Sequence, residues 1–233
     1  MMISTALAVQ VESIRKVFCQ EAENVCAVRD VSLDIERGEF TAIAGPSGSG
    51  KTTLLNLIGG LTRPTSGRIS IAGQDIVAMS NQELAKLRLR EIGFVFQAYN
   101  LLPVLSAFEN AEFQMLLQGV AKAERYQRVT ALFERTGMAG LRDRKPGKLS
   151  GGQQQRVAVI RAVAGRPALV LADEPTANLD SSASESLLDM MYELNRELNV
   201  TFMFATHDSR VMHRARRLIR MVDGVIDSDE RYR

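Results

Sequence analysis

The sequence predicts an α/β protein in which helices cover both faces of a parallel sheet. One observation is a set of three short apolar runs, 168–172, 201–205 and 218–221, which helix-length stretches separate. Such runs are typical of parallel strands that are buried on both sides. The other observation is Gly45–Thr52, which fits the phosphate-binding pattern G-x-x-x-x-G-K-S/T at every fixed position.

The segment ahead of this loop predicts a group of antiparallel strands. Apolar residues recur at every second position at Leu7, Val9 and Val11, and two further apolar runs cover 25–28 and 31–35. Period-two spacing is the pattern of a strand with one buried face. We expect three more strands along this part of the chain, at 40–44, 68–72 and 92–96.

The loop predicts a ligand as well as a turn. A glycine-rich connection between a strand and the helix expected at 53–58 lets several backbone N–H groups converge on one anion. Lys51 can reach the outer phosphates of a nucleotide, and the Thr52 hydroxyl can hold Mg²⁺. We expect a nucleoside triphosphate to contact Gly45, Pro46, Ser47, Gly48, Ser49, Gly50, Lys51, Thr52 and Thr53.

Beyond the strand expected at 92–96, the pattern changes to helices. Apolar residues at three-to-four spacing predict helices over 107–117 and 121–136, and a third helix over 151–164 follows a break at Pro146 and Gly147. We expect one domain, with a helical subdomain at 98–164 inserted into a nucleotide-binding core made of 1–97 and 165–233.

Composition narrows the class of protein. The net charge of +2 argues against nucleic acid as the main partner. Nothing approaches the ~18 consecutive apolar residues of a membrane span, and Met1–Leu7 lacks the basic start and apolar core of a secretory signal. Cys19 and Cys26 lack metal-ligand spacing, so the simplest interpretation is two free thiols in a reducing cytosol.

Two acidic residues, Asp173 and Glu174, end the apolar run at 168–172. Asp173 would emerge beside the phosphate loop, where it can hold Mg²⁺ directly or through water. Glu174 would face another direction, in which a carboxylate can orient the attacking water and accept its proton. An apolar strand that ends in Asp-Glu is a weak signal alone, and it is the phosphate loop that favours the catalytic interpretation.

The segment Leu149–Gln153 suggests a second anion site. Ser150 is suited to cap a helix, and a plain cap is the structural interpretation of it. Capping does not explain Gly151 and Gly152 inside the first turn, where each glycine costs about 1 kcal/mol relative to alanine. Close approach of a ligand would account for both glycines.

Together these motifs resemble the ATP-binding-cassette (ABC) ATPases over nearly all of the chain. Residues 45–52 match their Walker A loop, 168–173 their Walker B strand and 149–153 their signature motif. The resemblance implies a P-loop NTPase (RecA-like) core with a parallel sheet, an N-terminal antiparallel β-subdomain and a helical insertion subdomain. It also implies that the chain binds ATP and Mg²⁺ and hydrolyses the ATP.

Further residues take their roles from this resemblance. Gln97 matches the glutamine that senses magnesium, water and the transporter, and His207 matches the switch histidine near the γ-phosphate. Phe18 falls where the family usually has a tyrosine that stacks on adenine. A loop glutamine, a strand-end histidine and a core aromatic are the alternatives for these three. The catalytic set is then Lys51, Gln97, Glu174 and His207, and the metal set is Thr52, Gln97 and Asp173.

In this family two cassettes bind head to tail, and each ATP lies between one Walker A loop and the signature of the other copy. The chain carries one of each, so the resemblance implies a homodimer or a paired cassette. The residues implied at that junction are Ser150, Gly151, Gly152, Gln153 and Asp180.

The runs 94–103 and 153–156 resemble the branch that contains the lipoprotein-release, macrolide-export and cell-division cassettes. Ala177 departs from the glycine usual in that branch, but it removes no reacting group. The branch implies a separate membrane permease as partner and a cytoplasmic position on the inner face of the cell membrane. Two alternatives stay open: a nucleotide-gated regulatory scaffold, and a soluble ABC ATPase that does not serve transport.

Overall fold

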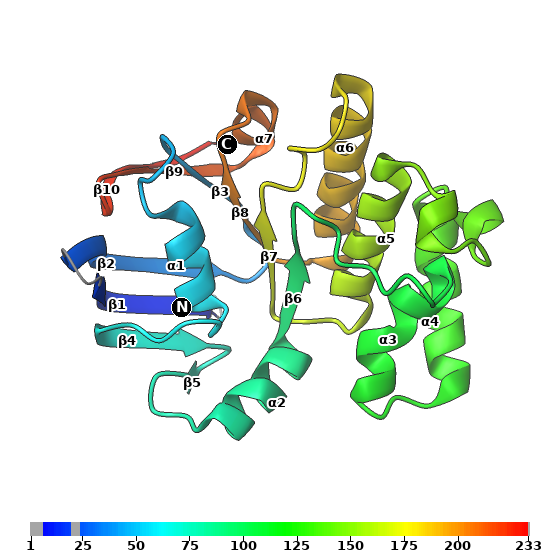
Figure 1. The fold of residues 1–233 in the computed structure, drawn as a ribbon, viewed down its shortest axis with the longest axis horizontal. Coiled ribbons are helices and arrows are strands. Elements are labelled where there is room, and N and C mark those ends of the chain that lie inside the picture. Colours follow the sequence, from blue (N-terminus) through cyan, green and yellow to red (C-terminus); the bar gives the residue numbers. More distant parts are fainter. Residues whose placement is uncertain (1–6, 20–23, 233) are drawn as a thin grey trace, which may run out of the picture.

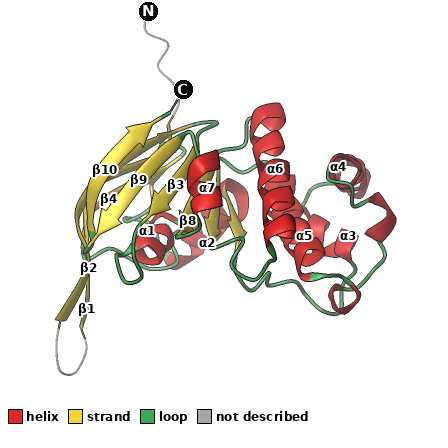
Figure 2. Cartoon of the chain, turned by 90° about the horizontal axis from the view of Figure 1, so that it is seen from above, coloured by secondary structure: helices red, strands yellow, loops and turns green. Residues whose placement is uncertain are grey.

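The computed structural model describes residues 7–19 and 24–232. The expectation about a secretory signal concerned Met1–Leu7, and residues 1–6 of that segment lie outside the described residues. Strands gather at one end of the molecule, and α3 (Ala107–Leu117), α4 (Lys122–Arg135) and α5 (Gly151–Ala164) gather at the other (Figures 1 and 2). Among the described residues, no helix is both long and apolar enough to span a bilayer.

The central sheet has six strands in the order β10-β9-β3-β8-β7-β6. Neighbouring pairs from β9 to β6 run parallel, as the apolar runs predicted. The edge strand β10 is antiparallel to β9, so the sheet is mixed rather than purely parallel. The strands are β3 (Phe40–Ala44), β6 (Ile92–Val95), β7 (Leu169–Asp173), β8 (Phe202–Thr206), β9 (Arg217–Val222) and β10 (Val225–Arg231).

A second, antiparallel sheet confirms the strands expected ahead of the phosphate loop. Its order is β2-β1-β4-β5, made by β1 (Leu7–Cys19), β2 (Asn24–Glu36), β4 (Ser66–Ile71) and β5 (Gln74–Asp75). Helix α1 (Lys51–Ile58) packs in one hydrophobic cluster with both sheets, because Leu54 and Leu57 join Val9 of β1 and Ile43 of β3. Burial of these side chains fixes the helix that leaves the loop.

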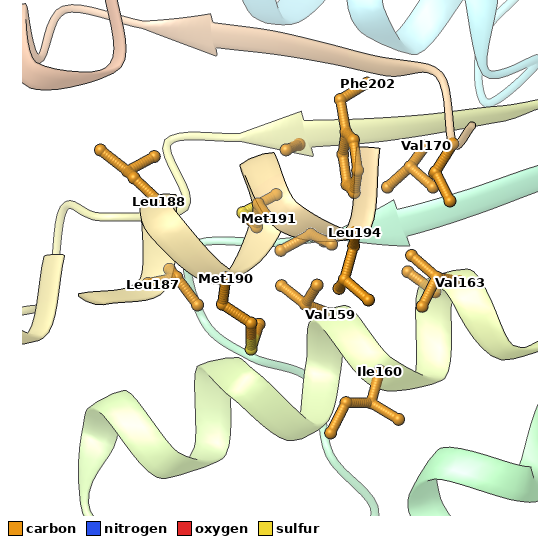
Figure 3. Close-up of a cluster of buried hydrophobic side chains, with 14 of the residues drawn as sticks. Val159, Ile160, Val163, Val170, Leu187, Leu188, Met190, Met191, Leu194 and Phe202 are labelled. Carbon is orange, nitrogen blue, oxygen red and sulfur yellow. The ribbon is translucent and has the colours of Figure 1, made fainter. Parts of the chain in front are cut away.

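A separate hydrophobic cluster joins α5, α6 (Ser181–Leu198) and the central sheet. Figure 3 shows Val159 and Val163 of α5 near Leu194 of α6, with Val170 and Phe202 from the strands. Helix α5 therefore lies in a different cluster from α1. The remaining helices are α2 (Asn81–Glu91), α7 (Ser209–Arg214) and two short 3-10 turns at Ala139–Leu141 and Pro146–Lys148.

Serine caps explain where three of these helices begin. Ser80, Ser106 and Ser150 each accept a bond from the backbone N–H three residues on, and the acid or amide there bonds back to the serine N–H. This reciprocal pair satisfies two backbone donors that a helix start leaves free. Helices α3 and α5 therefore start at the predicted residues, and they also end there.

Four adjacent parallel strands bring the site together. Their carboxyl ends lead into Gly45 after β3, Gln97 after β6, Glu174 after β7 and His207 after β8. Loops at the carboxyl ends of neighbouring parallel strands meet at one edge of the sheet, which is where ligands bind in open α/β folds. The fold therefore gathers residues that are up to 162 positions apart in the chain, from Gly45 to His207.

Arg217 anchors β9 and β10 to the start of β3, and removing it should destabilise the fold. Its side chain is 8% exposed and lies 3.0 Å from Glu39 Oε2 and 2.7 Å from Asp229 Oδ2. Arg217→Met removes the arginine that pairs with Asp229 and leaves Glu39 with Arg231 alone, so the free energy of unfolding should fall by about 3 kcal/mol in urea titrations. The neighbouring exposed arginine gives a matched control, because Arg216→Met should cost less than about 1 kcal/mol.

This arginine also makes the stability depend on pH. The hydrogen bond from Arg217 is the main reason that the pKa of Asp229 lies below its usual value. A carboxyl whose pKa is lowered by folding stabilises the protein above its unfolded pKa of about 3.9, and that stabilisation is lost as the pH falls through the folded value. The parent should therefore lose stability more steeply in acid than Arg217→Met. Equal stability and equal acid slopes would contradict the anchoring role.

Candidate nucleotide site

The phosphate loop is packed too closely for side chains at two of its glycines. A Cβ on Gly45 would lie 2.1 Å from the Met221 carbonyl oxygen, and one on Gly50 would lie 2.4 Å from that of Ala27. Gly50 also has a φ of 99°, which favours glycine. A Cβ on Gly48, in contrast, would meet no atom within 4 Å. The loop is thus held by β2 and β9 on one side and open at its tip.

Lys51 lies inside this loop. Its side chain is buried, and Nζ donates to the carbonyl oxygens of Gly45 at 2.8 Å and Pro46 at 2.9 Å. Helix α1 starts beside it without a side-chain cap, so N–H groups of the first turn are free to bind an anion. The ammonium group and the helix start together make the loop electropositive.

Thr52 and Asp173 meet at the metal position that the sequence predicted. Thr52 Oγ1 donates to Asp173 Oδ1 over 3.1 Å. Burial raises the pKa of Asp173, the hydrogen bond from Thr52 opposes that rise, and the Glu174 charge adds to it. A cation at this point would favour the ionised carboxylate. A hydroxyl and a carboxylate are oxygen donors of the kind that Mg²⁺ prefers alongside phosphate and water, so the residues fit that ion.

Glu174 has its backbone in the left-handed region. Its φ is 46°, which is uncommon for a residue with a side chain, and its N–H donates to the Ala205 carbonyl oxygen at 2.9 Å. Glu174 Oε1 lies 2.6 Å from His207 Nδ1, and Oε2 accepts from Thr206 Oγ1 at 3.3 Å. The expected base and the expected switch histidine are therefore in direct contact.

Two residues that sequence reasoning missed hold the segment around His207. Thr176 Oγ1 donates to Asp208 Oδ2 at 2.8 Å, and the Asp208 N–H donates to Thr206 Oγ1 at 2.9 Å. Burial opposes ionisation of Asp208, but hydrogen bonds from Arg210 and Thr176 outweigh it and lower the pKa. The aspartate directly after the histidine was the available signal. It ties the loop after β8 to the loop after β7.

Gln97 also reaches the loop after β7. Its Nε2 lies 3.5 Å from Asn178 Oδ1, and Asn178 Nδ2 donates to the Gln97 carbonyl oxygen at 3.0 Å. Nearby, Asp180 caps α6 by accepting from the Ala183 N–H at 2.8 Å. The structure thus gives Asp180 a structural task besides its expected place at a junction between copies.

The signature segment begins α5 with a capping box. The Ser150 N–H donates to Gln153 Oε1 at 3.0 Å, and the Gln153 N–H donates to Ser150 Oγ at 3.2 Å. A Cβ on Gly151 would lie 2.8 Å from the Tyr99 hydroxyl, and one on Gly152 would lie 3.2 Å from Ala183 Cβ. The capping interpretation of Ser150 is confirmed, and contacts within the chain supply a further reason for both glycines.

The signature and the phosphate loop are not joined within one chain. Among the hydrogen bonds and ion pairs of residues 7–19 and 24–232, none links 150–153 to 45–52. A hollow of about 390 Å³ borders the signature instead, lined in part by Ser150, Gln153 and Asp180. The hydrogen bonds and ion pairs of the described residues therefore do not hold the signature against the phosphate loop of the same chain.

Phe18 lies on β1 with its ring partly in solvent. The residue is 39% exposed, and Lys16 Nζ lies 4.8 Å from the ring centroid. The ring is therefore not a core side chain. Strand β1 pairs with β2, whose Ala27 carbonyl oxygen abuts the phosphate loop at Gly50, so the aromatic ring belongs to the hairpin that borders the loop.

These observations define the chain as a P-loop nucleoside triphosphatase, with a glycine-rich loop between β3 and α1 and acids at the end of a neighbouring strand. The family model described as ABC transporter matches residues 28–177. The chain belongs to the ABC transporter family. It is an ATPase of that class, as the resemblance implied.

Named relatives agree with the predicted branch. The chain is 45% identical over 223 residues to the macrolide export ATP-binding/permease protein MacB of Syntrophobacter fumaroxidans, covering 95% of this chain and 31% of that protein. It is 43% identical over 226 residues to the lipoprotein-releasing system ATP-binding protein LolD of Anaeromyxobacter dehalogenans, covering 97% of this chain and 95% of that protein. The chain thus spans under a third of the MacB relative and nearly all of the LolD relative.

A solved structure shows the same fold. It is a dimeric ATP-binding cassette in a post-hydrolysis state bound to ADP and Pi, with a TM-score of 0.87 and 38% sequence identity. The match covers 97% of this chain and 99% of that one. The predicted fold class is therefore confirmed.

Proposed function

We propose that the chain is the ATP-hydrolysing subunit of a membrane transport complex, in which two cassettes close around two ATP molecules and drive a permease. The observation that carries this proposal is the meeting of Lys51, Thr52, Asp173, Glu174 and His207 at one sheet edge, while no hydrogen bond among the described residues joins the signature to its own loop. A second copy would supply the missing half. The dimeric ADP-bound relative supports this arrangement.

In the proposed reaction each side chain has one task. Lys51 neutralises charge on the outer phosphates, and the Glu174 carboxylate orients the attacking water and receives its proton. His207 holds the γ-phosphate end through its imidazole. Thr52, Asp173 and Gln97 would hold Mg²⁺, which when bound stabilises the charge that develops on the phosphates. Ser150, Gly151, Gly152 and Gln153 would contact the nucleotide of the other copy, whereas Phe18 would stack on the adenine of the ATP bound by its own phosphate loop.

The similarity to the lipoprotein-release and macrolide-export branch supports a membrane permease as the partner. MacB and LolD are named as parts of export and lipoprotein-releasing systems, which supports a permease for this chain as well. Leu102 and Val104, just after Gln97, are 38% and 73% exposed. Exposed apolar side chains close to the Gln97 loop could form a docking surface for a helix of that permease. We also propose that 98–164 forms the helical subdomain and that the chain works on the inner face of the membrane.

Gly152→Asp tests whether the signature acts across two copies. The new carboxylate would face the γ-phosphate of the other copy, so ATP-dependent pairing should be lost while one copy still binds ATP within about threefold of the parent. Pairing is measured by light scattering after gel filtration with MgATP, in a Glu174→Gln background that prevents turnover.

Two controls separate charge from shape. Gly152→Asn has nearly the same shape without the charge and should retain more pairing than Gly152→Asp. Gly140→Asp adds the same charge where a Cβ meets no atom within 4 Å, and it should pair like the parent. Loss of ATP binding by a single copy of Gly152→Asp would show that the signature serves its own loop.

A further inference from the structure

Gln155 is a buried glutamine on α5 that has no task in the proposed phosphate chemistry. It is 0% exposed, and its Nε2 donates to the carbonyl oxygens of Phe96 at 3.2 Å and Pro175 at 2.8 Å. Phe96 directly precedes Gln97, and Pro175 directly follows Glu174. One amide group therefore bonds both loops that carry these two functional residues.

The surroundings fix which way this amide points. Backbone carbonyls only accept hydrogen bonds, so the nitrogen of Gln155 has to face Phe96 and Pro175. Gln155 Oε1, on the other side, is buried and has no hydrogen-bond partner among the described residues. An unpaired buried acceptor is unfavourable, and an apolar side chain of similar length would avoid it. Packing alone does not account for a glutamine here, whereas the two donated bonds do.

Helix α5 holds the loop after β6 at other points too. Arg161 donates to the carbonyl oxygens of Asn100 at 2.5 Å and Tyr99 at 3.0 Å. Among the hydrogen bonds of the described residues, the one from Gln155 to Pro175 is the bond that joins α5 to the loop after β7. Gln155 is thus placed to connect α5 with both loops at once.

We propose that Gln155 is a positioning residue that sets the spacing between Gln97 and Glu174 according to the position of α5. This inference rests on the proposed function, because α5 begins with the signature at Ser150, which is expected to engage the nucleotide of the other copy. If α5 shifts when the two copies close, the bond from Gln155 to Pro175 would move Glu174, the proposed base of the same copy. Gln155 itself contacts no phosphate in this mechanism.

Gln155→Met tests the proposal, since methionine has similar length but no donor. The kcat for ATP should fall roughly ten- to hundredfold, because a misplaced base lowers the rate without weakening nucleotide binding. The KM for ATP and the Kd of a fluorescent ATP analogue should stay within about twofold of the parent. A residue needed only for folding would not split kcat from KM in this way.

Gln154→Met is the matched control. Gln154 precedes Gln155 on α5, and its Nε2 donates at 3.1 Å to the carbonyl oxygen of Leu149, just before that helix begins, rather than to a distant loop. This variant should keep the kcat of the parent within about twofold. Thermal melts of all variants report whether each one is folded.

Two outcomes would overturn the inference. One is a folded Gln155→Met chain with the kcat of the parent. If Gln155→Met does not fold, Gln155→Asn is tested instead, because its amide is one methylene too short to reach both carbonyl oxygens. The second outcome that would overturn the inference is a folded Gln155→Asn chain with the kcat of the parent. If both the parent and the variant hydrolyse ATP at the same rate, the positioning role is refuted but the proposed function stands. If the parent itself does not hydrolyse ATP, both proposals are refuted.

Discussion

A Glu174→Gln chain is expected to bind ATP normally, to lose at least about a hundredfold in turnover and to accumulate as a closed dimer. General bases contribute on the order of 10²–10⁴ in rate, and an amide retains the shape of the carboxylate without its basicity. Without hydrolysis the phosphates stay between the two copies and keep them together. Phosphate release measures the turnover, and light scattering with MgATP measures the dimer.

The matched control is a glutamate of the same chain that lies in solvent. Glu193 is exposed on α6, so Glu193→Gln should hydrolyse ATP like the parent and should not accumulate as a dimer. Turnover at the parent rate in Glu174→Gln would remove Glu174 as the base. His207 contacts the same carboxylate at 2.6 Å and would then be the next residue to substitute.

Lys51→Ala is expected to abolish ATP binding. The substitution removes the ammonium group at the centre of the loop and leaves the carbonyl oxygens of Gly45 and Pro46 without the bonds that it donates. Lost charge-assisted bonds to phosphate together with the disturbed loop should weaken ATP binding by at least about a hundredfold. Titration with a fluorescent ATP analogue measures the affinity.

Lys86→Ala provides the comparison for a simple loss of charge. Lys86 is exposed on α2, so its removal changes the net charge equally while leaving the loop intact. Its affinity for the analogue should match the parent. Normal affinity in Lys51→Ala would show that 45–52 is not the phosphate site, and it would refute the nucleotide assignment.

Much of the fold could be predicted because its local signals are strong. Helices α3 and α5 have the predicted bounds, since a serine cap precedes each and apolar side chains follow at helical spacing. Strand β10 had no such signal. Its sequence VIDSDER is polar and its side chains are largely exposed, so no apolar run marks it. Pairing with β9, rather than local pattern, forms this strand.

The candidate site likewise has parts that the sequence could predict and parts that it could not. The phosphate loop, the two acids and the signature are contiguous motifs, so the sequence alone could predict them. Contacts between loops could not be predicted, because they join residues far apart in the chain: Gln155 to Phe96 spans 59 positions, and Thr176 to Asp208 spans 32. The left-handed backbone at Glu174 likewise has no local signal, and the N–H of this residue bonds to Ala205 of the neighbouring strand β8.

The contact between Glu174 and His207 has a practical consequence for experiments. One ring nitrogen of the imidazole is engaged by the carboxylate, while 70% of the side chain is open to solvent. The nitrogen-15 chemical shift of this ring nitrogen should change when the contact with the Glu174 carboxylate breaks. Nitrogen-15 spectra of His207 would therefore report whether Glu174 is free to act on water, and they need no label on the nucleotide.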